Sequence, residues 1–174
     1  KNCYGFLRFS ISMKKVFRQS VEFLFLENNQ MLFVPKKIKR FKNLQIIDLD
    51  NNKLKEVPTV LIKLRNLEEL NLSKNPIRKI SNNVKRWRKL KKVVMANNQM
   101  DKFPIAFCKV KTLESVNFAK NNIKIISSEI NKMKNLKGLI LYENEISELP
   151  PELFQLYNHY LHQSLREENY ALWQ

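Results

Sequence analysis

The residues of this 174-residue chain that look best suited to chemistry are its two histidines, His159 and His162. Two imidazoles three positions apart could share a metal ion, but no clustered cysteine or carboxylate completes a ligand set here. The chain holds two glycines, Gly5 and Gly138, and therefore no glycine-rich phosphate loop. No nucleophile can be paired with a base and an orienting acid. We predict no cofactor, no metal site and no catalytic activity.

Lysine and arginine offer a second chemistry, the binding of phosphate groups. The chain carries 32 basic and 16 acidic residues, a formal net charge of +16. Ten basic residues recur in two columns with a period of 23 residues: Arg40, Lys63, Arg86, Lys109 and Lys132 in one, and Lys42, Arg65, Arg88, Lys111 and Lys134 in the other. Such columns could bind nucleic acid or an anionic membrane surface weakly and without sequence preference. The alternative is a solvated face, because both columns flank a buried position.

The same period runs through the apolar residues and defines the structural unit. Leucine recurs 23 residues apart within the string LxxLxLxxNxLxxhP, where h is apolar, at Leu44, Leu67, Leu90, Leu113 and Leu136. Six such units fit residues 21–158 without an insertion or deletion. Positions 1, 4, 6, 11, 14, 18 and 21 of the unit are apolar in all six. This self-similarity predicts stacked repeats that share one continuous core.

Asparagine occupies position 9 of every unit. The six residues are Asn29, Asn52, Asn75, Asn98, Asn121 and Asn144. An amide that turns inward where a strand ends can satisfy backbone groups that would otherwise be unpaired. An apolar substitute would leave such groups unpaired, at about 1–3 kcal/mol each. We therefore predict that the asparagines are structural.

The repeating unit resembles that of leucine-rich repeat proteins. It is similar to the 23-residue intracellular type of Ras-suppressor-like and plant intracellular Ras-group-related proteins, which reads LxxLxLxxNxLxxLPxxIxxLxx. The proline position holds Pro35, Pro58, Pro104 and Pro150 but also Ser81 and Ser127. The resemblance implies an α/β fold: a right-handed, curved solenoid with a parallel sheet on its concave face and short helical or extended segments on its convex face. It also implies a non-catalytic scaffold that binds another protein.

The chain reads as one domain whose ends depart from the repeat. We predict an N-terminal cap or degenerate repeat over residues 1–20 and a C-terminal capping helix over residues 159–174. No apolar run is long enough to span a membrane. The two cysteines are too few for the disulfide-stapled caps that extracellular relatives usually carry, which favours an intracellular location, cytoplasmic or nuclear. Because the chain begins with Lys1, secretion after loss of a signal peptide is the alternative.

The alternation of a strand sorts the remaining side chains. Positions 3, 5 and 7 alternate with the buried positions 4 and 6 and so face the concave side. From them we predict a partner-binding surface formed by Phe23, Phe25, Ile46, Asp48, Asp50, Val94, Ile140 and Tyr142. Positions 2–8 hold five lysines against eight acids, whereas positions 10–23 hold 21 basic against six acidic residues. The basic charge therefore belongs to the convex and flanking side. For the two phenylalanines, contact with the N-terminal cap is the alternative.

Overall fold

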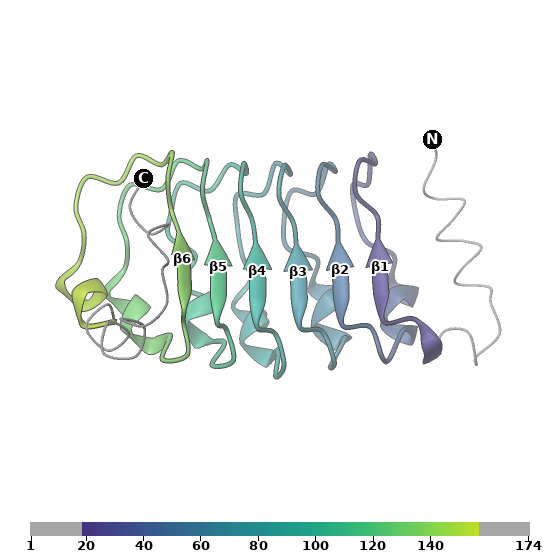
Figure 1. Cartoon of the computed structure of the whole chain (residues 1–174). Helices are drawn as coiled ribbons and strands as arrows, with labels where there is room; N and C mark the ends of the chain where they lie inside the picture. The colour runs from purple at the N-terminus through teal and green to yellow at the C-terminus, as the bar shows by residue number, and fades with distance from the viewer. Residues whose placement is uncertain (1–18, 157–174) are drawn as a thin grey trace.

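The computed structural model describes residues 19–156, in which six repeats each contribute one three-residue strand. The strands pair in parallel and in chain order, forming one six-stranded sheet (Figure 1). They are β1 (Phe23–Phe25), β2 (Ile46–Asp48), β3 (Glu69–Asn71), β4 (Lys92–Val94), β5 (Ser115–Asn117) and β6 (Gly138–Ile140). Each residue pairs with the one 23 positions later, as Phe23 does with Ile46. The register of the sheet is therefore the period of the sequence.

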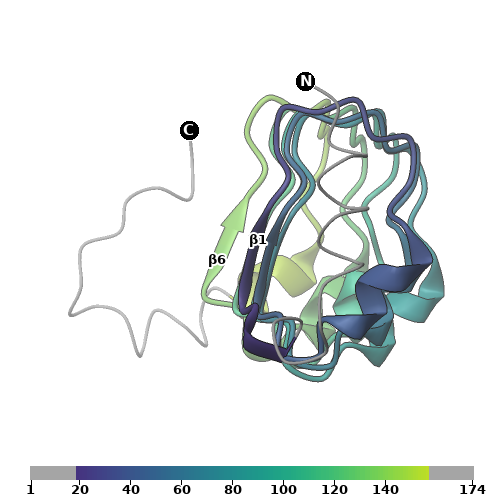
Figure 2. The same cartoon turned by 90° about the vertical axis from the view of Figure 1, so that its right-hand side faces the viewer.

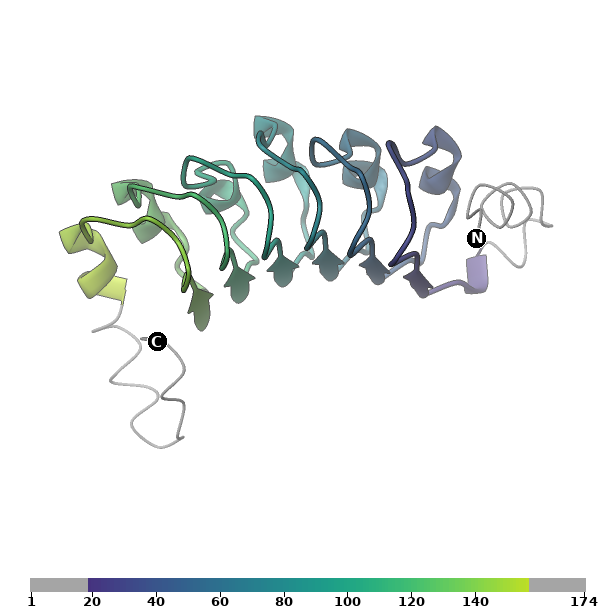
Figure 3. The same ribbon diagram turned by 90° about the horizontal axis from the view of Figure 1, so that it is seen from above.

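Short 3-10 helices form the opposite side of the repeats. Within the described residues they are η1 (Lys36–Arg40), η2 (Thr59–Lys63), η3 (Asn82–Arg86), η4 (Phe107–Lys109) and η5 (Ser128–Lys132). A view along the stack shows the sheet on one side and the helices on the other (Figure 2). Seen from above, the stack bends so that the sheet lines its inner side (Figure 3). The predicted leucine-rich repeat solenoid, with a concave parallel sheet and a helical convex face, is confirmed.

Proline and serine begin four of the five 3-10 helices of residues 19–156, η1, η2, η3 and η5, in two equivalent ways. Pro35 and Pro58 are the N-caps of η1 and η2, with φ of −60° and −64°, the range that the proline ring imposes. Ser81 and Ser127 keep nearly the same φ, −70° and −73°, without a ring. Their hydroxyl oxygens instead accept hydrogen bonds from the backbone N–H two residues on, at 3.3 and 3.2 Å. The departures from the proline pattern thus preserve the helix by a side-chain cap.

The seven apolar columns form one continuous core. The side chains of these columns that are not fully buried are Val21, Ile80, Leu139, Leu141, Ile146 and Leu149. Leu149 is 37% exposed, which corrects its predicted burial. Four of the six belong to the last repeat, which has a neighbouring repeat on one side only among the described residues. At the centre of the core, the buried Trp87 donates its indole N–H to the carbonyl of Leu61 at 3.2 Å.

Position 8 of every repeat has a left-handed backbone. The φ angles lie between 50° and 56° at Asn28, Asn51, Lys74, Asn97, Lys120 and Glu143. Side chains other than glycine are strained in this region, and asparagine tolerates it better than lysine or glutamate. The three asparagines therefore fit their backbone, whereas the lysines and the glutamate are held there by the stacking of the repeats.

Replacing Lys74 with asparagine should therefore stabilise the protein by about 0.5–1 kcal/mol, because it relieves this strain. The substitution removes an exposed ion pair with Asp50 (3.2 Å), which contributes little. In return, the new amide can extend a ladder in which Asn51 Nδ2 already donates to Asn28 Oδ1 at 2.9 Å. Urea denaturation would measure the change, with Lys53→Asn as the control outside the left-handed column. If both substitutions changed the free energy of unfolding equally, the left-handed backbone at Lys74 would not be strained.

The predicted N-terminal cap and C-terminal capping helix lie largely outside the residues that the structure describes. The N-terminal cap (residues 1–20) lies outside them apart from residues 19 and 20, and the C-terminal helix (159–174) lies wholly outside. A helical turn is present earlier, over residues 151–156. No helix between residues 19 and 156 is long and apolar enough to cross a membrane.

Candidate protein-binding surface

The asparagine column holds the end of each strand in place. Asn75 Nδ2 donates to the carbonyls of Leu49, Leu72 and Ser73 at 2.9, 3.1 and 2.9 Å, and its Oδ1 accepts from the N–H of Leu54 at 3.0 Å. The equivalent asparagines of repeats two, five and six make the same contacts within their own repeat and to the preceding one. In repeat four, Asn98 bonds to the N–H of Ile77 and to the carbonyls of Leu72 and Ala96. The predicted structural role is confirmed, and the concave side chains stand on this rigid frame.

The aromatic residues at the two ends of the sheet are its most exposed apolar side chains. Phe23 and Phe25 of β1 are 52% and 62% exposed, and Ile46 lies beside Phe23 on β2, half-buried. At the other end Tyr142 is 43% exposed, next to the half-buried Ile140. Adjacent strands are about 4.8 Å apart, so about 24 Å separates β1 from β6.

The predicted partner-binding residues thus share one face but form two separate groups. Between them the half-buried Val94 of β4 is an apolar side chain that pairs in register with two polar ones, Asn71 and Asn117. Small residues occupy position 7 of repeats three to five, as Ser73, Ala96 and Ala119. Of these, the Ser73 hydroxyl is buried without a hydrogen-bond partner in the described structure. The middle of the face therefore lacks large exposed apolar side chains, whereas its two ends carry them.

Asp48 closes the turn after its own strand. Its Oδ1 accepts from the N–H of Asp50 at 2.8 Å, and its Oδ2 accepts from Asn71 Nδ2 at 3.0 Å. Asn71 and Asn117, at the same position of later repeats, likewise accept from the N–H two residues on, both at 3.0 Å. A polar residue at position 5 therefore closes the turn after the strand, a role that the alternation pattern missed.

Ion pairs neutralise the middle of the concave face. Each lysine of positions 2–8 pairs with an acid of an adjacent repeat: Lys74–Asp50 (3.2 Å), Lys91–Glu68 (2.7 Å), Lys92–Glu69 (3.4 Å), Lys120–Glu143 (3.2 Å) and Lys137–Glu114 (2.8 Å). At position 2 the signs alternate from Glu68 through Lys91 and Glu114 to Lys137. Hydrogen bonding to Glu68 accordingly raises the pKa of Lys91, and hydrogen bonding to Lys137 lowers the pKa of Glu114. Being exposed, these pairs add little stability but set the local charge.

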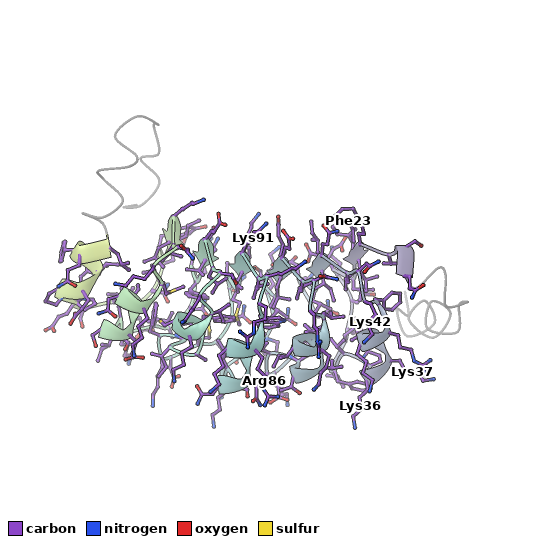
Figure 4. The ribbon with its side chains drawn as sticks, turned by 90° about the horizontal axis from the view of Figure 1, so that it is seen from below. Phe23, Lys36, Lys37, Lys42, Arg86 and Lys91 are labelled. Carbon is purple, nitrogen blue, oxygen red and sulfur yellow. The ribbon has the colours of Figure 1, made fainter. Side chains whose placement is uncertain are left out.

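The ten residues of the basic columns are all exposed. Lys132 pairs with Glu129 at 2.6 Å. Apart from Lys132 and Lys134, none of the ten has an ion-pair partner among residues 19–156. Figure 4 shows Lys36, Lys37, Lys42 and Arg86 on the helical side, away from the edge of the sheet that carries Phe23 and Lys91. The unpaired cations are thus separated from the concave face, as predicted.

A second amide column escaped the sequence analysis. At position 23, Asn66 and Asn135 each donate from Nδ2 to a backbone carbonyl of the preceding repeat, at 2.9 and 2.8 Å, and Asn43 donates to the carbonyl of Gln19, just before the first repeat, at 2.7 Å. The available signal was the recurrence of asparagine at multiples of 23 residues. These bonds join neighbouring repeats beside the basic columns.

The described residues contain little that is arranged for catalysis. Burial raises the pKa of the Cys108 thiol to about 12, so the thiolate form that would act as a nucleophile is scarce at neutral pH. No three potential metal ligands cluster between residues 19 and 156. The two histidines at 159 and 162 lie outside this range.

Comparison with known families agrees with this geometry. A model of leucine rich repeats matches residues 19–77 and 42–100, covering the first three repeats and the first half of the fourth. The chain is a leucine-rich repeat protein. Proteins of this family are commonly non-enzymatic scaffolds that bind other proteins. No curated protein matches the sequence.

Two solved structures are similar to this leucine-rich repeat protein. One is a leucine-rich repeat protein of Leptospira interrogans, with 26% identity and a TM-score of 0.61, covering 84% of this chain and 44% of that one. The other is the glycosylated Toll–Spätzle complex of Drosophila, with 23% identity and a TM-score of 0.69, covering 77% of this chain and 20% of that one. This second likeness concerns the fold alone. The chain spans less than half the length of either structure.

Proposed function

We propose that this leucine-rich repeat protein is a non-catalytic scaffold that binds another protein on its concave sheet. One observation carries the proposal: Phe23 and Phe25 are more than half exposed on that face, while the intervening Leu24 is buried. Two large aromatic side chains that can be desolvated together are typical of binding hot spots. Ile46 continues this apolar patch onto β2, and Tyr142 offers a second anchor on the repeat that carries β6.

Alanine at both Phe23 and Phe25 should abolish capture of the partner and leave the melting temperature nearly unchanged. Truncating exposed side chains removes the hot spot without opening a cavity in the core. The measurement is capture from native extract by the tagged chain, followed by mass spectrometry, with thermal unfolding in parallel. Ile125→Ala is the matched control, because Ile125 is 69% exposed but lies off the sheet. A lower melting temperature with capture intact would instead assign the phenylalanines to a contact within the chain.

We also propose a second activity, weak and sequence-independent binding of polyanions through the two basic columns. The cations of both columns are exposed, and eight of the ten, all but Lys132 and Lys134, have no ion-pair partner among residues 19–156. Cations on neighbouring repeats repel one another, and salt or a row of phosphates relieves that repulsion. Base stacking would not contribute, because Phe41 and Trp87 between the columns are buried. Retention on heparin at low salt, and its loss as salt rises, would test this activity.

We further propose that the protein is intracellular, either cytoplasmic or nuclear. Cys108 is a free thiol, and its burial keeps it from forming a disulfide without local opening. Fluorescence microscopy of the chain with a reporter in its own cells would test the location, with a secreted reporter as the contrary result.

A further inference from the structure

The ion pairs of the concave face leave an unbalanced charge at one end of the sheet. Positions 2–8 hold eight acids and five lysines. All five lysines are paired, each with a different acid. The three remaining acids are Glu22, Glu27 and Asp48, which have no ion-pair partner among residues 19–156. All three belong to the first two repeats, so the negative charge gathers at the β1 end.

These acids surround the exposed apolar patch. Glu22 directly precedes β1 and Glu27 follows it two residues after its end, and both are exposed. Four residues lie between them, so their Cα atoms are five steps of extended chain apart, about 17 Å. Phe23 and Phe25 lie between them, and Asp48 pairs in register with Phe25 on the neighbouring strand. We call this surface, formed by Glu22, Phe23, Phe25, Glu27, Ile46 and Asp48, the acidic–aromatic end.

We infer that the acidic–aromatic end binds an arginine-bearing apolar segment of a partner protein. The inference rests on the proposed function and names the chemistry of its partner. Apolar side chains of the segment would cover the Phe23 and Phe25 rings, and arginines on either side would reach Glu22 and Glu27. Arginine suits the site better than lysine, because its planar guanidinium can both pair with a carboxylate and stack on an aromatic ring.

Charge on the rest of the molecule restricts where such a segment can bind. The basic columns of repeats one to five repel it from the convex side of those repeats, and the paired lysines leave the middle of the sheet without unbalanced charge. Repeat six carries Glu145, Glu148 and Glu152 in place of a basic column, but these acids lie off the sheet. An acidic segment would meet the opposite pattern and be drawn to the columns. Electrostatic complementarity therefore directs a basic apolar partner to the β1 end of the concave face.

A synthetic probe can test this chemistry without knowledge of the natural partner. We would use a fluorescent eight-residue peptide with two arginines at each end and four apolar residues, leucine and phenylalanine, in the middle. The second and seventh residues of this peptide are separated by the same number of residues as Glu22 and Glu27. Peptides with lysine or glutamate in place of arginine are the matched probes, and anisotropy at two salt concentrations measures the affinity.

We expect the arginine peptide to bind more tightly than the lysine peptide and the glutamate peptide to show no binding at this end. Glu22→Gln with Glu27→Gln should weaken the arginine peptide about tenfold at low salt, and less at high salt. Phe23→Ala with Phe25→Ala should weaken both peptides, and the arginine peptide more than the lysine peptide, because the arginines also lose their stacking on the rings. Asp101→Asn, which removes an exposed acid away from the sheet, is the control and should change nothing.

Equal binding of the arginine and glutamate peptides, or no effect of the double glutamine variant, would overturn the inference. If the phenylalanine variant nevertheless failed to capture the partner from extract, the proposed protein-binding function would hold and only the inferred chemistry of the partner would be wrong. Residues 1–18 of this chain are themselves basic and apolar. If the wild type bound no peptide and the double glutamine variant had a lower melting temperature, residues 1–18 would be the segment that binds the acidic–aromatic end, and the inference of a partner protein would be wrong. A self-association of the wild type that the glutamine variant loses in sedimentation would assign it to a second copy.

Discussion

Asn75→Leu should lower the free energy of unfolding by about 3 kcal/mol. The carbonyls that Asn75 contacts have other donors: Leu49 O also accepts from Asn52 Nδ2, and Leu72 O from Asn98 Nδ2. The N–H of Leu54 is different, because its hydrogen bond is to Asn75 Oδ1 and the side chain of Leu54 is buried. Leucine would leave this donor unpaired and would place a branched apolar group among polar backbone atoms.

The matched control is Lys85→Ala on η3, where the side chain is exposed. A surface substitution of this kind should change stability by no more than about 0.5 kcal/mol. Urea denaturation of both variants, followed by circular dichroism, gives the two free energies. If both changes were small, the position 9 amides would not hold the repeats together, and the assigned register would be wrong.

The register and the core could be predicted because one period governs both. An apolar residue that recurs every 23 positions must occupy the same place in each repeat, so Leu24 pairs with Ile47 and both are buried. The position 9 asparagines follow from the same argument, since only a group with donors and an acceptor satisfies a turn that repeats. Leu149 departs in the last described repeat, which has a described neighbour on one side only.

Other features depend on geometry that periodicity does not reveal. The left-handed backbone at Lys74, Lys120 and Glu143 follows from how strand and turn join, and their side chains do not disclose it. The turn-closing bond of Asp48 is similar, because alternation says which face a side chain occupies but not what it binds. The ion pairs of the concave face could have been found, since Glu68, Lys91, Glu114 and Lys137 alternate in sign along one column.

This distinction also explains why the partner surface remains a proposal. The sequence pattern predicts Phe23 and Phe25 as binding residues because they are large, apolar and at outward strand positions. Both lie on the sheet face and are more than half exposed. Exposure permits binding but does not identify what binds. The acids that have no ion-pair partner restrict the chemistry of the partner further. Which acids these are depends on which lysines pair with the others, and net charge alone does not reveal it.

Replacing Arg65, Arg86 and Arg88 with glutamate should remove most of the affinity for polyanions. If the wild type neutralises about five phosphates of duplex DNA, the slope of log affinity against log salt should be about −4.5. A fourfold rise in salt would then weaken binding about 500-fold. The triple variant loses three of these contacts and gains three repulsive charges, so its slope should be about −1.8 or flatter. Fluorescence anisotropy with labelled DNA over a salt series measures both quantities.

Two controls separate the columns from the overall charge of the protein. Glutamate at Lys53, Lys55 and Lys102 changes the net charge by the same amount at exposed positions outside the columns. Since phosphate contacts are local, this variant should keep most of the slope, whereas a purely long-range effect would lower both variants equally. Alanine at Phe23 and Phe25 should leave DNA binding unchanged, because those side chains lie on the concave face. A triple arginine variant with wild-type affinity and salt dependence would show that the columns are a solvated face, and the second proposed activity would be withdrawn.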